Sequence, residues 1–361
     1  MRTPHLAVAV VAAVALTSLC VSGCQSSSAA SHTLDMSNGT DVAPGTENAR
    51  HGDEIVIAGR YFRTGTPVVL WTDPGGYDAY RTEYRFEPFD KRRYDPEVRA
   101  LLGPQRYNLR EDRLSDEELE DVRGGGWTLD LLRRQIDQFV IHYDVCGVSR
   151  QCFRILHDIR GLSVHFMLDV DGTIYQTLDV KERAWHAAQA NSRSIGIEIA
   201  NIGAYPPPTD QRGPGAPLPE TLETWYETDT AGIARLTLPA WLGDGGIRTP
   251  NFVAKPARAE PVYGDIHGST YAMYDLTPEQ YHALIRLTAT LCTVFPEISA
   301  DYPRGPNGEV LTRAFTEEEY NSFGGLVGHF HLTEGKNDPG PAFDWDRVVD
   351  GAQAIMPRRE R

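Results

Sequence analysis

The chain has 361 residues, of which 41% are hydrophobic and 9% aromatic, so it is long enough for one catalytic domain with additions and apolar enough for a packed core. Its formal net charge of −15 excludes nucleic acid and anionic lipid headgroups as main partners, because both require clustered lysine and arginine. Any attachment to a membrane must therefore come from something other than a basic surface.

The first 23 residues have the pattern of an export signal. Arg2 supplies positive charge, residues 6–19 form an apolar run too short to span a membrane, and Val-Ser-Gly-Cys24 follows. These last four residues resemble a bacterial lipobox, which implies that signal cleavage leaves Cys24 as a lipidated N-terminus. An ordinary secretory signal, cleaved elsewhere, is the alternative. We expect an exported, lipid-anchored protein at the periplasmic face of the outer membrane, given a Gram-negative envelope.

Two N-terminal segments are expected before the main domain. Residues 24–52 are rich in Ser, Thr, Asn and Gly and lack the apolar content for packing, so they predict a flexible tether. Residues 53–126 are expected to form an accessory region, in which two β-branched runs within 54–74, separated by Arg-Thr-Gly-Thr, predict a hairpin. Helices are expected on both sides of three consecutive glycines, over residues 115–122 and 128–138.

From residue 127 to 355 the pattern is that of an α/β domain, because short apolar runs alternate with amphipathic ones. Thr277, Pro278 and Gln280 are the N-cap, first-turn proline and capping-box residue of a long helix. Residues 204–265 are rich in Pro and Gly without sustained periodicity and predict a long insertion, partly folded at best. The expected strands are 139–143, 163–169, 173–177, 194–200 and 325–328, and the expected helices are 153–159, 278–295 and 343–350.

Two histidines and an aspartate are the clearest candidates for metal binding. Of eleven histidines, His142 and His329 each end an apolar strand, and Asp338 follows His329 in a loop with no apolar anchor. Histidines at the ends of adjacent strands, joined by a carboxylate from a neighbouring loop, suit a tetrahedral zinc site that keeps its fourth position for water. The spacing alone is a weak signal for such a site.

Five stretches between residues 139 and 345 resemble the type-2 amidase and peptidoglycan-recognition-protein superfamily, in that family's order. The resemblance covers a little over half of the chain, and it leaves the N-terminal region and the insertion unexplained. It implies a central mixed β-sheet flanked by helices. The stretches are Phe-Val-Ile-His142-Tyr, the run from Ser163 to Gln176, the run from Ala184 to Ile199, Val-Gly-His329, and Lys336-Asn-Asp-Pro-Gly-Pro-Ala-Phe-Asp-Trp345.

Carried over residue by residue, the resemblance implies one zinc ion per chain, bound by His142, His329 and Asp338. It implies Glu198 as the general base and Lys336 as the cation that stabilises the oxyanion. The sequence agrees with the role of Glu198, because its apolar neighbours raise its proton affinity. The alternatives are that Glu198 is an outward residue of an edge strand and that Lys336 is an ordinary loop lysine.

The resemblance also implies substrate contacts from Trp185, His186, Asn191 and His165. Trp185 could equally be a core residue. His165 lies inside an apolar strand, where a buried histidine that holds its neighbours is a strong alternative.

The sequence departs from the family pattern at two places. The interval from His329 to Asp338 is one residue shorter than usual, which leaves His331 as an alternative ligand. Val164 stands where some relatives carry a catalytic tyrosine, so Glu198 must act instead.

Three cysteines follow the lipobox, and export places them in an oxidising compartment where pairing is expected. Cys146 and Cys152 are close enough in sequence to close a small loop, and their spacing is that of a disulfide in many peptidoglycan recognition proteins. Cys292 lies on the apolar face of the 278–295 helix and is expected to be a small buried hydrophobe.

The function that the resemblance implies is hydrolysis of the amide between N-acetylmuramic acid and L-alanine, in peptidoglycan or in soluble muropeptides, by a zinc-activated water. A peptidoglycan-binding receptor of the same fold is one alternative, although such relatives generally lack a metal ligand. A zinc amidase that acts on another acyl-peptide is the second. We expect a monomer, with peptidoglycan as its partner and a membrane attachment through Cys24 alone.

Overall fold

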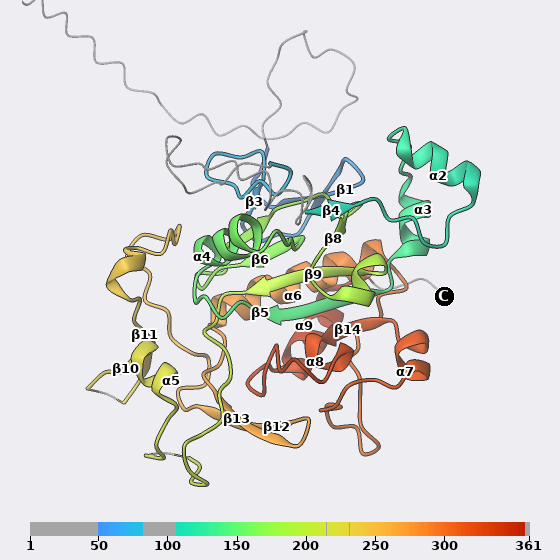
Figure 1. Cartoon of the computed structure of the whole chain (residues 1–361). Helices are drawn as coiled ribbons and strands as arrows, with labels where there is room; N and C mark the ends of the chain where they lie inside the picture. Colours follow the sequence, from blue (N-terminus) through green and yellow to red (C-terminus); the bar gives the residue numbers. More distant parts are fainter. Residues whose placement is uncertain (1–49, 82–105, 214, 231, 358–361) are drawn as a thin grey trace, which may run out of the picture. The chain divides into compact units, whose positions relative to one another are not determined.

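The computed structural model describes residues 50–81, 106–213, 215–230 and 232–357 (Figure 1). The expected signal peptide, most of the expected tether and Cys24 lie outside these residues. Within the described part of the chain, no helix combines the length and the apolar character needed to cross a membrane.

A mixed six-stranded sheet forms the centre of the molecule, as the resemblance implied. Every neighbouring pair of its strands is parallel except β6 and β7, which are antiparallel. The strands in spatial order are β14 (Gly325–Gly328), β5 (Gln138–Tyr143), β9 (Ser194–Ile199), β6 (Phe166–Leu168), β7 (Ile174–Gln176) and β3 (Val68–Leu70).

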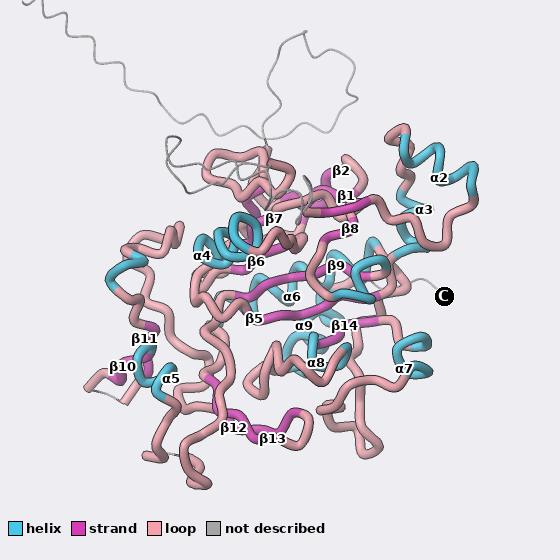
Figure 2. Tube along the Cα trace, in the orientation of Figure 1, coloured by secondary structure: helices cyan, strands magenta, loops and turns pink. Residues whose placement is uncertain are grey.

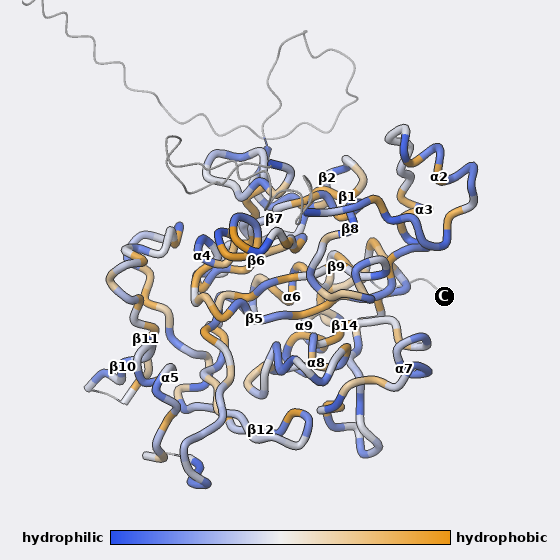
Figure 3. The backbone as a smooth tube through the Cα atoms, in the orientation of Figure 1, coloured by the Kyte–Doolittle hydropathy of each residue, from blue (hydrophilic) through white to orange (hydrophobic). Residues whose placement is uncertain are grey.

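One face of this sheet packs against two helices, α6 (Pro278–Val294) and α9 (Trp345–Ile355). Alternate residues of β5 and β9, such as Phe139 and Ile197, are buried with residues of these helices in the main hydrophobic core. Because side chains alternate along a strand, His142 and Glu198 must point to the opposite face. Figure 3 shows hydrophobic residues along β5, β9 and α6, whereas α2 and α7 are mostly hydrophilic.

The long helix α6 begins where the sequence predicts. Thr277 accepts a hydrogen bond from the backbone N–H of Gln280, and the Gln280 side chain accepts one from the backbone N–H of Thr277. This reciprocal pair satisfies N–H groups that have no partner inside a helix. Cys292 is fully buried on this helix, as expected.

The opposite face of the sheet, over β6, β7 and β3, is covered by α4 (Ser149–Phe153) and the π-helical turn Arg154–Ile159 that continues it. The sequence predicted one helix here, over residues 153–159. The structure instead starts the helical segment at Ser149 and widens its second half into a π-helix.

The N-terminal strands differ from the expected hairpin. The first β-branched run forms a hairpin by itself, in which β1 (Glu54–Ile57) pairs with β2 (Arg60–Arg63). Its turn is Ala58-Gly59, where both residues have positive φ, a conformation that favours glycine. The second run, β3, is fully buried and pairs in parallel with β7, so it is an edge strand of the central sheet.

The short helices α2 (Asp116–Arg123) and α3 (Leu129–Gln135) confirm the two predicted beside the glycines, with α3 ending earlier because β5 begins at Gln138. A two-stranded pair, β4 (Tyr107–Asn108) and β8 (Arg183–Ala184), ties this N-terminal part to the domain.

The insertion is more ordered than its composition predicts, although its short elements are joined by long loops (Figure 2). It contains α5 (Glu220–Trp225), the pair β10 (Tyr226–Thr228) and β11 (Ala234–Leu236), and a 3-10 turn at Ala240–Leu242. At its end β12 (Val262–Ile266) pairs with β13 (Ser269–Met273). Buried residues of the insertion and of β13, together with Tyr274 directly after it, form a separate small core that includes Leu222, Ala234 and Ala272. Two further helices, α7 (Glu317–Ser322) and α8 (His329–Leu332), flank β14.

Candidate active site

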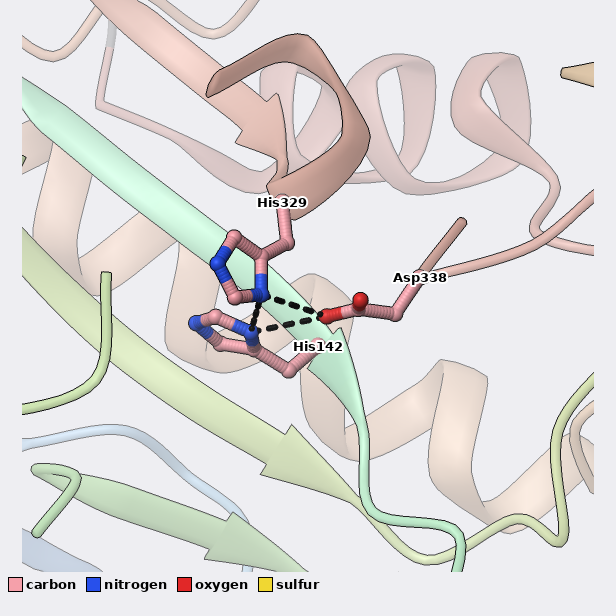
Figure 4. A group of neighbouring side chains, drawn as sticks. All are labelled: His142, His329 and Asp338. Atoms are coloured by element: carbon pink, nitrogen blue, oxygen red, sulfur yellow. Dashed lines mark hydrogen bonds and ion pairs between the residues drawn. The ribbon is translucent and has the colours of Figure 1, made fainter. Parts of the chain in front are cut away.

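Two adjacent strands and one loop bring together the three predicted metal ligands. His142 is near the end of β5, and His329 directly follows β14, which pairs in parallel with β5. Asp338 reaches them from the loop before α9, where its backbone carbonyl accepts the N–H of Phe330 at 3.1 Å. Figure 4 shows the three side chains directed at one another.

The three ligand atoms form a nearly equilateral triangle. His142 Nδ1 lies 2.8 Å from Asp338 Oδ2 and 3.0 Å from His329 Nδ1, and His329 Nδ1 lies 3.1 Å from Asp338 Oδ2. A tetrahedral zinc ion with nitrogen and oxygen ligands at about 2.0–2.1 Å requires those atoms to be about 3.3 Å apart. Two imidazole nitrogens and one carboxylate oxygen with this spacing therefore fit zinc and leave one coordination position open.

The protonation states of these ligands also suit a metal. Burial, with a smaller contribution from His329 beside it, lowers the pKa of His142 to about 4, so the ring is neutral at neutral pH. Burial alone would raise the pKa of Asp338, but the hydrogen bonds from His142 and His329 outweigh it and hold that pKa well below its usual range. Neutral imidazole and ionised carboxylate are the forms that bind metal.

His186 supports the outer side of the His142 ring. His186 Nδ1 is 3.0 Å from His142 Nε2, and His186 Nε2 is 3.3 Å from Ser194 Oγ. When Nδ1 of His142 offers its lone pair to a metal, Nε2 carries the proton and donates to His186. Such an outer partner fixes the tautomer and orientation of a metal-binding histidine. The family resemblance implied that His186 contacts the substrate, and His186 does line the cleft.

Gly196 makes room for this arrangement. A Cβ atom at this position on β9 would be only 2.5 Å from Nδ1 and Cε1 of the His186 ring. The ring of His186 therefore lies directly over the strand, which it could not do over any residue with a side chain.

A cleft of about 280 Å³ opens at the three ligands, and Glu198 and Lys336 also line it. Glu198 is the register partner of His142 on β9 and lies on the same face of the sheet. Burial raises the pKa of Glu198 well above its usual range, and the carboxylates of Asp338 and Asp144 raise it further. The side chain of Lys336 is exposed. The structure thus brings together all five residues predicted as ligands or catalytic groups.

The end of the insertion holds the loop that carries Lys336. His267, in the turn between β12 and β13, donates from Nε2 to the backbone carbonyl of Lys336 at 3.0 Å. In the same loop Asn337 donates from Nδ2 to the carbonyl of Ala204 at 3.3 Å and accepts a hydrogen bond from the hydroxyl of Tyr143. Ala204, at the start of the insertion, and His267, just after its end, therefore both contact the loop that carries Lys336, and no sequence motif predicted these contacts.

His165 is fully buried and belongs to the scaffold of the site. Its Nδ1 accepts the backbone N–H of Gly196 at 3.1 Å, and its Nε2 donates to the carbonyl of Glu182 at 2.9 Å. Burial, with a smaller contribution from the guanidinium of Arg110, lowers the pKa of His165 to about 3. This arrangement agrees with the alternative of a buried histidine that holds its neighbours.

Arg110 is a structural residue that the sequence did not identify. It is fully buried, and burial lowers its pKa to about 9. Its guanidinium donates to the carbonyl oxygens of Val180, Asn191, Ser192 and Ser194 at 2.8–3.3 Å. Arg110, from the N-terminal region, therefore holds the backbone of residues 191–194 in place where β9 begins. From the sequence alone, a single arginine in a loop that is buried for a structural role cannot be told apart from one that is exposed to solvent.

Trp185 and Asn191 lie outside the set of residues that line the cleft. The indole nitrogen of Trp185 donates to Asn108 Oδ1, and its side chain is half-buried. The buried Asn191 accepts the backbone N–H groups of His186 and Ala187 at 3.1 and 2.6 Å. In this structure Asn191 therefore orients the backbone at His186.

His331 is not available as the alternative ligand. Its Nδ1 accepts the backbone N–H of Gly328 at 2.8 Å, and its Nε2 donates to the carbonyl of Leu311 at 2.7 Å. Burial lowers the pKa of His331 to about 3, so the ring is neutral and both nitrogens are occupied. Asp338 reaches the histidines in spite of the shorter interval. Val164 is fully buried, which agrees with its having no catalytic part.

The expected disulfide between Cys146 and Cys152 is not formed in the structure, where both are buried free cysteines. Their sulfur atoms and a carboxylate oxygen of Asp144 lie within 4.8 Å of one another. Burial raises the pKa of the Cys152 thiol well above its usual range, and the neighbouring thiol of Cys146 contributes. Oxidation of this pair in the exported protein stays a prediction.

Comparisons with known proteins point to one family. Residues 132–218 match the family model described as N-acetylmuramoyl-L-alanine amidase, a span that includes His142 and Glu198. No curated protein matches the chain. The crystal structure of an AmpD derivative is similar at 18% identity, with 70% of this chain and 90% of that chain covered and a TM-score of 0.31.

Two further solved structures are similar at the same low level. The amidase AmiD from E. coli, in complex with anhydro-N-acetylmuramic acid-L-Ala-D-gamma-Glu-L-Lys, is 18% identical over 62% of this chain and 58% of that chain, with a TM-score of 0.32. The endolysin amidase LysCS from Clostridium intestinale URNW is 16% identical over 63% and 88%, with a TM-score of 0.31. Because these TM-scores are low, the similarity to this family rests on the match of residues 132–218 to the family model. Residues 132–218, which carry His142 and Glu198, are therefore similar to the N-acetylmuramoyl-L-alanine amidase family.

Proposed function

We propose that this protein hydrolyses the amide bond between N-acetylmuramic acid and L-alanine, in peptidoglycan or in soluble muropeptides, with one zinc ion held by His142, His329 and Asp338. The observation that carries this proposal is the convergence of the three ligand atoms, 2.8–3.1 Å apart, in a cleft that Glu198 and Lys336 also line. The substrate follows from the family that residues 132–218 match.

Each residue of the cleft has a distinct part in this proposal. His142, His329 and Asp338 would hold the zinc ion, which would supply a water molecule whose pKa is lowered from about 16 to about 7, so that hydroxide is available at neutral pH. The carboxylate of Glu198 accepts the proton of the attacking water and later transfers it to the leaving amide nitrogen. Its raised pKa suits both transfers. The ammonium group of Lys336 stabilises the negative charge that develops on the carbonyl oxygen.

The two alternatives receive less support. A receptor that binds peptidoglycan without cleaving it has no need for a complete ligand set or for a half-buried carboxylate in the same cleft, and both are present. A zinc amidase with another acyl-peptide substrate uses the same chemistry, so only the choice of substrate distinguishes it.

The location of the protein is part of the same proposal. We propose that it is exported and anchored by a lipid on Cys24 at the periplasmic face of the outer membrane, as a monomer. The lipobox pattern at residues 21–24 supports this. If Cys24 carries the lipid, Cys24→Ser should move the protein from the detergent phase to the aqueous phase without loss of amidase activity. A variant that still partitions with detergent would rule out the anchor.

A cleavage assay tests the proposed reaction. The purified protein is incubated with intact sacculi and, separately, with the anhydro-muropeptide named above, and free peptide with a new N-terminal alanine is measured by mass spectrometry. We expect release of the peptide, loss of release with a chelator, and recovery on addition of zinc. Binding without release in every condition would favour the receptor, and release only from other acyl-peptides would favour the second alternative.

A further inference from the structure

Val145 has an unusual backbone conformation beside the candidate active site. It lies in the loop between β5 and α4, and its φ of +55° is in the left-handed region. A β-branched residue is rare there, because its side chain crowds the backbone. Gly147, in the same loop, has a similar φ of +72° without that penalty.

Neighbouring hydrogen bonds hold this conformation firmly. The N–H of Val145 donates to the carbonyl of Asn201 at 3.1 Å. On the residue before it, Asp144 Oδ1 accepts the backbone N–H groups of Cys146, Gly147 and Asn201 at 2.9–3.1 Å. The loop therefore determines the backbone of Val145, whichever side chain the residue carries.

The stability of the fold does not explain why residue 145 is a valine. Val145 is 52% exposed, so it contributes little to a hydrophobic core, and a glycine would adopt the same backbone with less strain. Val145 lines the cleft at the three candidate metal ligands, and the apolar lining of this cleft also includes Ile155, Leu156 and Leu162. Strained residues with no structural purpose are found preferentially at ligand sites.

We propose that Val145 determines substrate specificity by contacting the small alkyl side chain of the amino acid next to the scissile amide. This inference rests on the proposed function, which places the scissile carbonyl at the three zinc ligands. The first side chain on the peptide side then lies within a few ångströms of that point. An apolar group at the edge of this cleft favours a methyl substituent over hydrogen, because their contact removes apolar surface from water.

The test compares two substrates and two glycine variants. The substrates are N-acetylmuramoyl peptides that carry either L-alanine or glycine at the amide, and the readouts are kcat/KM and Tm. One methyl group in an apolar pocket changes kcat/KM by about ten-fold or more, so we expect the wild type to prefer alanine by about ten-fold. Val145→Gly should reduce this preference to about two-fold or less and, because strain is relieved, raise Tm by a few degrees.

Ala58→Gly is the matched control, because Ala58 also has a positive φ, of +50°, and lies in the β1–β2 turn and not among the residues that line the cleft. It should raise Tm and leave the alanine preference unchanged. An unchanged preference in Val145→Gly, or a lower Tm, would overturn the role of Val145 while leaving the amidase reaction intact. If the wild type cleaves neither substrate, the proposed function fails as well.

Discussion

Gly196→Ala should weaken zinc binding without touching a zinc ligand. The added Cβ would lie 2.5 Å from Nδ1 and Cε1 of the His186 ring. Ordinary contact requires about 3.5 Å, so the ring must move by about 1 Å. His186 Nδ1 is 3.0 Å from His142 Nε2, and a displacement of this size takes it out of hydrogen-bonding position.

Loss of an outer hydrogen-bond partner typically costs 10- to 100-fold in metal affinity. We therefore expect the zinc dissociation constant of Gly196→Ala to rise about 10- to 100-fold, measured by competition with a chromophoric chelator. His186→Ala removes the same hydrogen bond directly and should give an increase of similar size. In the double variant the second substitution should add little, because both remove one interaction.

Gly335→Ala is the matched control. Gly335 lines the same cleft, and an added Cβ there would meet only Thr333 Oγ1, at 3.8 Å. Its zinc affinity should stay within about two-fold of wild type. If Gly196→Ala folds and binds zinc as tightly as this control, the proposed support of His142 by His186 is refuted.

Three further predictions concern Glu198, His267 and Asp169. Glu198→Gln should retain zinc and lower kcat by about 10²- to 10⁴-fold, whereas wild-type activity would remove Glu198 from the mechanism. His267→Ala should lower kcat about ten-fold or more with zinc retained, because the carbonyl of Lys336 loses its donor, and Thr270→Val on the same hairpin should not. Asp169 is buried directly after β6, and burial raises its pKa to about 7. The protonated carboxyl therefore stabilises the fold fully below a pH of about 4, and this contribution is lost as the pH rises through about 7. Urea unfolding should therefore show Asp169→Asn overtaking wild type at pH 8, by up to about 4 kcal/mol, and parallel pH curves would contradict the shift.

Local patterns in the sequence predict the core of the domain well. The apolar runs at β5 and β9 fix which residues face α6, and the same alternation places His142 and Glu198 together on the other face. The capping residues at Thr277 and Gln280 mark the start of α6 for an equally local reason. The three residues of the candidate metal site could be picked out because each follows a recognisable strand or motif.

Features that depend on distant contacts could not be predicted. The sequence around residues 68–70 predicts one strand of a hairpin, but the strand is buried at the sheet edge because it pairs with the distant strand β7. Arg110 and His267 act through backbone carbonyl groups of other segments, which leave no residue pattern. The positive φ of Val145 is held by its own N–H, which donates to the carbonyl of Asn201, and by backbone N–H groups that donate to Asp144 Oδ1. Neither this conformation nor its consequence can be predicted from the order of residues.

Zinc stoichiometry tests the central claim most directly. Metal analysis of the purified protein should find one zinc per chain in the wild type and in His282→Ala, which replaces an exposed histidine of α6. His142→Ala should contain almost none, because two ligands cannot hold the ion tightly. Full zinc occupancy in folded His142→Ala would contradict the assignment of the metal site and the mechanism built on it.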